Sequence, residues 1–186
     1  DSTTNKQKKT TMTLFKNKYR IESFRLKNWD YRNAGAYFIT ICTKNRENYF
    51  GKITDGEMQL SQIGEIVENE WIKTPEIRPD MNLKLGEYVV MPNHFHAILI
   101  IGQNEYNIQP DHGEYNNQFG PQSKNVSSII RGFKSAVTMA SRMIDPDFGW
   151  QSKFHDHIIR NHEEYLRIEN YIINNLKNWK EDKFYD

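Results

Sequence analysis

Short apolar segments separated by polar turns run along this chain, and their spacing predicts alternating strands and helices. Segments dense in β-branched and aromatic residues predict four strands, over residues 36–43, 88–91, 95–101 and 150–160. Apolar residues at helical spacing predict three helices, one between Ser61 and Pro75, one over about 127–143 and one over 163–179. Pro92 and Asn93 join the two middle strands as a hairpin.

The predicted order of elements is β-α-β-β-α-β-α. Its first six elements match the ferredoxin-like βαββαβ pattern, an α+β fold whose antiparallel sheet carries helices on one face, and a C-terminal helix follows. We expect one domain over residues 19–186, behind a basic and disordered tail over residues 1–18. Because this arrangement serves many unrelated functions, the function must be sought in the site.

Local signals mark the ends of the helices. Ser61 followed by Glu65 is interpreted as a capping box, and Pro75 is expected to end the first helix. Residues 102–125 are rich in Asn, Gln, Gly and Pro without periodicity, which predicts a long mobile loop.

Composition narrows the class of protein. The chain has 186 residues, 37% of them hydrophobic and 13% aromatic, enough to fill the core of one domain. No apolar run approaches the roughly 20 residues that cross a bilayer, so no membrane partner is expected. The single cysteine, Cys42, excludes an intramolecular disulfide, and a cytoplasmic location is the expectation.

Basic residues are segregated along the chain although the formal net charge is only +1. Residues 1–32 carry nine Lys or Arg against three acids, and residues 122–143 carry four and no acid. Segregated basic surfaces suit a polyanion, because each neutralised phosphate releases condensed counterions. The candidates for phosphate contacts are Arg25, Lys27, Arg131, Lys134 and Arg160.

Two histidines open the apolar strand over 95–101. Side chains alternate between the faces of a strand, so His94 and His96 point the same way and Phe95 points the other way. Two imidazoles at this spacing beside a hairpin can hold one divalent cation.

A tyrosine and an asparagine lie on the last predicted helix. Tyr171 and Asn175 are four residues apart, hence neighbours on one helix face, at the edge of its apolar stripe. Mg²⁺ or Mn²⁺ held by His94, His96 and the Asn175 side-chain oxygen would polarise a DNA phosphate, with zinc as an alternative. Tyr171 would then be the nucleophile, giving a 5′-phosphotyrosyl bond and a free 3′-hydroxyl.

At these residues the chain resembles the HUH single-strand DNA transposases, and among them the REP-associated tyrosine transposases. The resemblance covers about residues 19–180 and rests on Tyr-Phe-Ile-Thr at 37–40, Val-Met-Pro-Asn-His-Phe-His at 90–96, Trp-Gln-x-x-Phe at 150–154, residues 156–160 and Tyr-Ile-x-x-Asn at 171–175. It implies cleavage and joining of single-stranded DNA near hairpins by a monomer or a homodimer. It also implies His94 and His96 as metal ligands, Tyr171 as nucleophile and Asn175 as third ligand. Family members often continue into Asn-Pro, whereas this chain continues into Leu176, which predicts that the helix runs on.

Other interpretations of these patterns stay open. His155, Asp156 and His157 form a second His-x-His that could be a rival metal site, or Asp156 and His157 could support the first one as second-shell groups. The βαββαβ order also builds RNA-binding modules, for which Tyr37, Phe38 and the strand of Phe95 could supply exposed aromatics. A metal-dependent phosphoesterase that uses water would keep the histidines and be indifferent to the tyrosine.

Overall fold

Four antiparallel strands form the central sheet, in the order β4-β5-β1-β6. They are β1 (Gly35–Cys42), β4 (Leu83–Met91), β5 (His94–Ile101) and β6 (His155–Ile159). This computed structural model describes residues 32–108 and 123–181. The expectations for the tail over 1–18, and for Arg25 and Lys27, lie outside the described residues.

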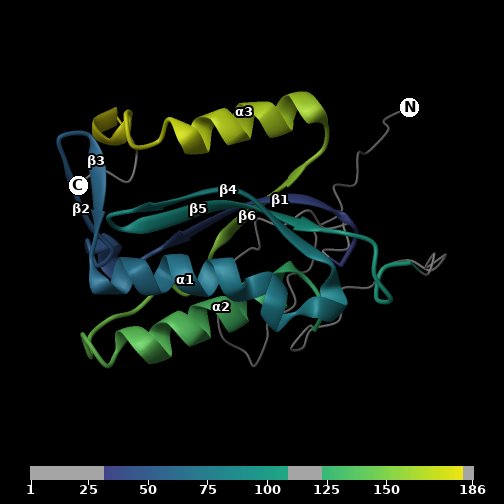
Figure 1. Ribbon diagram of the computed structural model, residues 1–186, viewed down its shortest axis with the longest axis horizontal. Coiled ribbons are helices and arrows are strands. Elements are labelled where there is room, and N and C mark those ends of the chain that lie inside the picture. Colours follow the sequence, from purple (N-terminus) through teal and green to yellow (C-terminus); the bar gives the residue numbers. More distant parts are fainter. Residues whose placement is uncertain (1–31, 109–122, 182–186) are drawn as a thin grey trace, which may run out of the picture.

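Helices cover both faces of this sheet, as Figure 1 shows. The first two helices, α1 (Gln62–Ile77) and α2 (Val126–Ser141), lie together on one face, and α3 (His162–Ile173) lies on the other. The ferredoxin-like arrangement is therefore confirmed, with the C-terminal helix on the face that α1 and α2 leave uncovered.

The alternation of side chains along β1 explains these two faces. Ile39 and Ile41 are fully buried in the larger hydrophobic cluster, which includes residues of α1 and α2. Phe38, which lies between Tyr37 and Ile39 in the sequence, packs instead on the smaller cluster, which contains Ile168 and Ile172 of α3. Because residues at i and i+2 share a face, the five-residue run from 37 to 41 supplies both sides of the sheet.

A second, two-stranded sheet was not predicted from the sequence. It consists of β2 (Gly51–Thr54) and β3 (Glu57–Leu60), which pair in register around Asp55 and Gly56. Both turn residues have positive φ, 54° and 81°, which is the requirement of a two-residue type I′ turn and the reason for the Asp-Gly sequence.

Two predicted boundaries and one predicted cap need correction. Helix α1 continues through Pro75 to Ile77, so the proline lies within the last turn and does not end the helix. Ser61 does cap this helix by accepting from the Gly64 amide, but Gly64 has no side chain to complete a capping box. The strand expected over 150–160 is limited to β6, preceded by an isolated bridge at Trp150.

The last helix is shorter than predicted. It ends at Ile173, and the N–H of the C-cap Asn174 donates to the carbonyl of Asn170. The Asn174 side-chain amide donates to the same carbonyl, at 2.8 Å. Asparagine side chains compete for backbone groups in this way and favour helix ends, so the chain turns before a short 3₁₀ helix, η4 (Trp179–Glu181).

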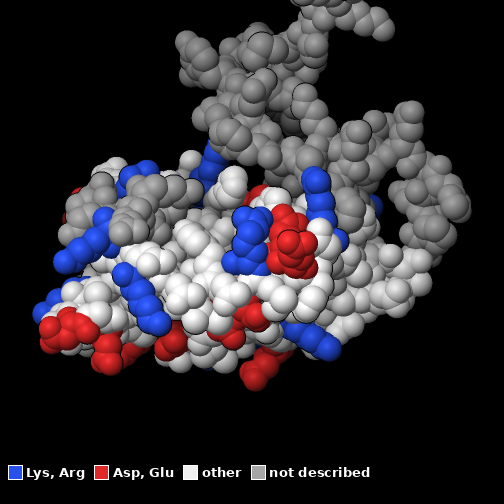
Figure 2. Space-filling model, turned by 90° about the horizontal axis from the view of Figure 1, so that it is seen from above, with Lys and Arg blue, Asp and Glu red and all other residues white. Residues whose placement is uncertain are grey.

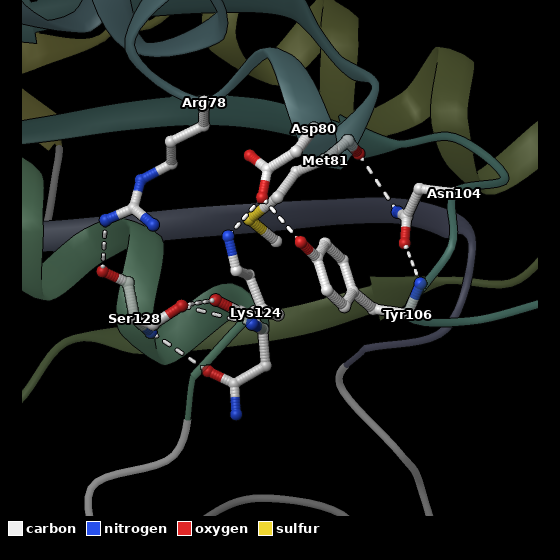
Figure 3. Close-up of polar contacts among 8 residues, drawn as sticks. Arg78, Asp80, Met81, Asn104, Tyr106, Lys124 and Ser128 are labelled. Atoms are coloured by element: carbon white, nitrogen blue, oxygen red, sulfur yellow. Dashed lines mark hydrogen bonds and ion pairs between the residues drawn. The ribbon is translucent and has the colours of Figure 1, made fainter.

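Polar contacts hold the two described flanks of the predicted loop over 102–125 (Figure 3). Lys124 and Tyr106 both donate to the carboxylate of Asp80, in η3 (Pro79–Met81), and the hydrogen bond from Lys124 is the main reason why the pKa of Asp80 is lowered. On the other side Arg78 donates to the Ser128 carbonyl at 2.9 Å. Residues 109–122 of this loop lie outside the described part of the chain. Within the described ranges, no helix combines the length and the apolar character that a membrane crossing requires.

Candidate active site

His94 and His96 lie side by side on the face of β5 that α3 covers. Both are buried, at 0% and 1% exposure, and their ring centroids are 4.6 Å apart. Phe95 between them points to the other face, where its ring lies 5.1 Å from that of Trp71. The same-face placement expected from strand alternation is confirmed.

A polar partner orients each histidine ring through its Nδ1 atom. Nδ1 of His94 lies 2.9 Å from the side-chain oxygen of Asn93, and Nδ1 of His96 lies 2.8 Å from the hydroxyl of Thr40. Because an amide oxygen only accepts, this contact favours the tautomer of His94 in which Nδ1 donates and Nε2 bears the lone pair. This is the orienting contact that ligating histidines make in metal sites.

Thr40 reaches His96 because of strand register. The two residues are direct partners in the antiparallel β1–β5 pair, so their side chains stand on the same face. Neither Thr40 nor Asn93 was predicted to orient a histidine. For Thr40 the reason is that its position opposite His96 depends on the register of two strands.

Tyr171 faces the same histidine pair from α3. Its hydroxyl lies 3.3 Å from Nε2 of His96, and the two ring centroids are 5.3 Å apart. The side chain is 42% exposed, so its hydroxyl is between a buried imidazole and solvent. The structure thus joins residues 75 positions apart that the sequence analysis had connected only through chemistry.

Phe38 completes this contact and was missed as a site residue. Its ring stacks on His96 at a centroid distance of 5.3 Å and meets the Tyr171 ring edge-on at 6.0 Å. Phe38 therefore fixes the spacing between the strand and the helix at the site. Its position two residues before Thr40 on β1 is the signal that could have identified it, once the pairing of β1 with β5 is known.

The segment after α3 returns to the other histidine. The Trp179 ring lies 5.8 Å from the His94 ring, with 32° between the planes. Asn175 lies between Tyr171 and Trp179 in the sequence, and its side chain is buried at 2% exposure. Asn175 is beyond the end of α3, so the predicted placement on one continuous helix face with Tyr171 is wrong, and its role as a metal ligand stays a prediction.

The predicted metal ligands, His94, His96 and Asn175, include no carboxylate and no thiolate. Within residues 32–108 and 123–181, no group of three or more His, Cys, Asp or Glu side chains could hold a metal ion. Two imidazoles and the Asn175 amide oxygen are all uncharged, so a divalent cation bound there would keep its full charge toward a phosphate. The rival site at His155 and His157 gains no support from the described residues.

Asp156 and His157 do not support the histidine pair. Asp156 pairs with Ile39, whose side chain is in the core beneath α1 and α2, so Asp156 is on the opposite face of the sheet from His96. Nε2 of His157 lies 2.8 Å from a carboxylate oxygen of Glu164, at the start of α3. The orienting roles expected for these two residues are therefore filled by Thr40 and Asn93.

Glu164 fastens the beginning of the helix that carries Tyr171. It accepts from the backbone amide of Arg160 and contacts His157, and these hydrogen bonds, in that order, lower the pKa of Glu164. The side chain of Asn161 caps the helix by accepting from the Glu164 amide. Arg160, expected to contact phosphate, is exposed at this β6–α3 connection.

Arg131 and Lys134 line a basic groove on the α2 side of the molecule. The groove has a volume of about 850 Å³, runs between α2 and residues 149–154, and also includes Lys44 and Arg142 but no acidic residue. Lys134 donates to the carbonyl of Gln151 at 2.7 Å, and burial lowers its pKa. The structure therefore brings these predicted phosphate contacts together on one face and Tyr171 on the opposite face.

The α3 face has a different charge pattern. Where the described residues are visible in Figure 2, basic and acidic side chains are interspersed, with uncharged surface between them. An acid-free basic lining is thus a property of the α2 groove and not of this face.

Comparison with known proteins places the chain in a family. No family model matches it. An uncharacterized protein of Haemophilus influenzae (strain ATCC 51907 / DSM 11121 / KW20 / Rd) is 39% identical over 173 residues, which cover 88% of this chain and 92% of that protein. The two proteins belong to one family.

A REP-associated tyrosine transposase bound to a REP hairpin has a similar structure. The TM-score is 0.55 and the identity 24%, over 85% of this chain and 74% of that one. The chain therefore has the fold of such a transposase, and the resemblance found in the sequence is confirmed at the level of the fold. A candidate transposase from Deinococcus radiodurans is more distant, with 16% identity and a TM-score of 0.41 over 82% of this chain and 97% of that one, and supports no inference.

Proposed function

We propose that this protein cleaves and rejoins single-stranded DNA near hairpin elements, with Tyr171 as the nucleophile. The observation that carries the proposal is the 3.3 Å contact between the Tyr171 hydroxyl and Nε2 of His96. Here the hydroxyl meets one of two adjacent buried imidazoles.

The reaction is a transesterification. The Tyr171 oxygen attacks the phosphorus, the bond between phosphorus and the 3′-oxygen breaks, and the 3′-oxygen takes up a proton to become a hydroxyl. The phenolic proton is released to solvent, which reaches this half-exposed side chain. The 5′-phosphotyrosyl bond keeps the energy of the phosphodiester, so attack by a 3′-hydroxyl rejoins the strand without ATP.

His94, His96 and Asn175 would hold Mg²⁺ or Mn²⁺. The residues fit this role because their donor atoms are imidazole nitrogens and an amide oxygen, and because Asn93 and Thr40 hold the Nδ1 atoms and so direct Nε2 of each ring away from them. The bound ion supplies charge neutralisation at the scissile phosphate.

Phe38 and Trp179 support the proposal because their rings pack against the residues that would carry out the reaction. The Phe38 ring packs against both the His96 ring and the Tyr171 ring, and the Trp179 ring lies beside His94. Rigid aromatic contacts of this kind keep the nucleophile aligned without a change of rotamer during attack.

Basic residues outside the site would bind the DNA backbone. The acid-free groove with Arg131 and Lys134 offers such a surface, with Arg160 at the β6–α3 connection, and Arg25 and Lys27 remain proposals on residues outside the described range. The transposase of similar fold is bound to a REP hairpin, which supports a hairpin partner for this chain, as a monomer or a homodimer.

A non-catalytic module that binds bases on its sheet is less favoured. Tyr37 and Phe95 are fully buried in the core beneath α1 and α2, and Phe38 is half-buried, with its ring against those of His96 and Tyr171. The aromatic residues needed for stacking on an open sheet face are therefore not presented.

The test is formation of a covalent protein–DNA adduct. Purified protein is incubated with Mn²⁺ and a labelled library of single-stranded hairpin oligonucleotides, and the products are separated on a denaturing protein gel. We expect an adduct that Tyr171→Phe abolishes and that chelator prevents. Tyr165→Phe is the matched control, since Tyr165 lies on the same helix and packs in the apolar cluster beneath it, and it should leave the adduct intact.

Two results would change the assignment. DNA cleavage that persists in Tyr171→Phe would favour a water-using metal phosphoesterase. Binding of hairpin DNA without cleavage or adduct, over the whole library, would favour a protein that recognises hairpins without catalysis.

A further inference from the structure

A groove opens beside the histidine pair, between the β2–β3 hairpin and the C-terminal segment. Its volume is about 680 Å³, within the range of roughly 300–1,000 Å³ typical of small-ligand sites. The lining comes from four separated parts of the chain and includes Asn48, Lys52, Gln59, Ser61, Pro92 and Trp179. In Figure 1 the hairpin stands at the edge of the molecule where the C-terminal segment ends, in agreement with this lining.

Two residues of the groove lie next to the candidate active site. Trp179 contributes to the groove and its ring also lies 5.8 Å from that of His94. Pro92 lines the groove immediately before Asn93, whose side chain holds Nδ1 of His94. The groove and the histidine pair are therefore neighbours in the fold.

The lining has the chemistry that binds a nucleotide. Lys52 and Gln59 are cross-strand partners in the hairpin, so the ammonium and the amide stand on the same face, and both side chains are exposed. Asn48 adds a second exposed amide, and the lining contains no carboxylate that would repel a phosphate. Trp179 supplies an indole surface for a base, since stacking on aromatic side chains binds single-stranded bases.

Gly51 lines the groove with a backbone conformation that favours glycine. Gly51 has a φ of 137°, and a Cβ atom there would be 2.1 Å from the carbonyl oxygen of Gln59. A side chain at Gly51 would therefore disturb the pairing of the hairpin strands, so glycine is required at this point of the groove.

We propose that this groove binds the nucleotide of the single strand next to the scissile phosphate. The base lies against Trp179, its edge is read by the amides of Asn48 and Gln59, and Lys52 contacts a phosphate. This proposal takes its substrate, single-stranded DNA, from the proposed function. It adds the residues that would select the nucleotide at the cleavage point. Amides pair with base edges by donating and accepting at once, which is how they discriminate between bases.

Photocrosslinking tests where the strand lies. Single-stranded hairpin oligonucleotides with 5-iododeoxyuridine at one position at a time are bound to the Tyr171→Phe variant, irradiated, and the linked peptide is identified by mass spectrometry. We expect crosslinks to the peptide that contains Trp179 from positions next to the cleavage point and not from the distant side of the hairpin. Crosslinks to other peptides from every position would overturn the proposal.

Sequence selection tests the reading of the base. The wild type and the Asn48→Ala and Gln59→Ala variants are given oligonucleotides randomised next to the cleavage point, and the adducts are sequenced. We expect the preference of the wild type at this position to fall by about tenfold in each variant. Lys52→Gln should weaken binding of all sequences alike, and Gln62→Ala, an exposed glutamine of α1 outside the groove, should leave the preference unchanged.

The outcomes separate this inference from the proposed function. Adduct formation with an unchanged preference in Asn48→Ala and Gln59→Ala would refute the groove and leave the tyrosine chemistry standing. Crosslinking to Trp179 in a protein that forms no adduct even with its tyrosine intact would refute the chemistry and leave the groove as a binding site for single-stranded DNA.

Discussion

Thr40 is the residue through which β1 orients His96, and its replacement by valine tests the proposed metal site most directly. Valine keeps the shape of threonine but removes the hydroxyl 2.8 Å from Nδ1 of His96. The imidazole would keep its place between Phe38 and Tyr171 but lose the partner that fixes its orientation.

The expected magnitudes separate a structural effect from an effect on the metal. A net hydrogen bond contributes about 0.5–1.5 kcal/mol to stability, which in a chain of this size is a fall of roughly 1–6 °C in Tm. Loss of an outer partner of a metal-binding histidine lowers metal affinity or activity by about 10–100-fold. We therefore expect Thr40→Val to remain folded and to need about 10–100 times more Mn²⁺ for half-maximal adduct formation.

The assay is the initial rate of adduct formation as a function of Mn²⁺ concentration, with Tm measured on the same samples. Thr40→Ser keeps a hydroxyl and should restore most of the metal affinity. Thr74→Val is the matched control, because Thr74 is also buried and donates to a helix carbonyl at 2.9 Å, on α1 and away from the site. It should lower Tm by a similar amount and leave the Mn²⁺ dependence unchanged.

One result would refute the reasoning about Thr40. A folded Thr40→Val variant with the Mn²⁺ dependence of the wild type would mean that Nδ1 of His96 does not need this partner for metal binding. If Thr74→Val shifted the Mn²⁺ dependence equally, the effect would be one of general stability.

Three further predictions concern α3, the hairpin and the basic groove. The pKa of Glu164 is lowered in the folded state from its ordinary value of 4.5. The ionised Glu164 therefore stabilises the folded protein above that pH, and this stabilisation is lost as the pH falls through the lowered value. Glu164→Gln should flatten the fall of Tm with pH in this range. Gly51→Ala should destabilise the protein by roughly 1–3 kcal/mol in urea unfolding, and Gly56→Ala by less, because a Cβ there meets no atom within 4 Å. Arg131→Gln should weaken hairpin DNA binding and reduce the slope of log affinity against log salt by about 1, without changing the rate of adduct formation at saturating DNA.

The local pattern of the sequence was sufficient for the elements that build the site. Alternation along β5 predicted that His94 and His96 share a face, and the helical spacing predicted the helix that carries Tyr171. These predictions succeed because side-chain direction within a strand or helix depends only on near neighbours in the chain. The Asp55-Gly56 turn was an equally local signal for the β2–β3 hairpin and was overlooked.

Contacts between distant segments depended on tertiary structure. Thr40 and Phe38 reach His96 only through the register of β1 on β5, and Asp156 is on the opposite face because of its register on Ile39. No local pattern determines which residues of two strands stand opposite each other, since the packing of whole faces sets that register.

The end of α3 illustrates the same division. The sequence placed Tyr171 and Asn175 near each other in the last segment, but it did not determine where the helix ends. The free energy of adding another helical residue differs only slightly from that of ending the helix at an asparagine cap. The turn at Asn174 carries Asn175 into a buried position and brings the Trp179 ring to His94. The sequence by itself determined which chemical groups the protein has and which face of its own element each occupies. Their distances, partners and order around the site were decided by how the sheet and α3 pack, because packing acts between residues that are far apart in the chain.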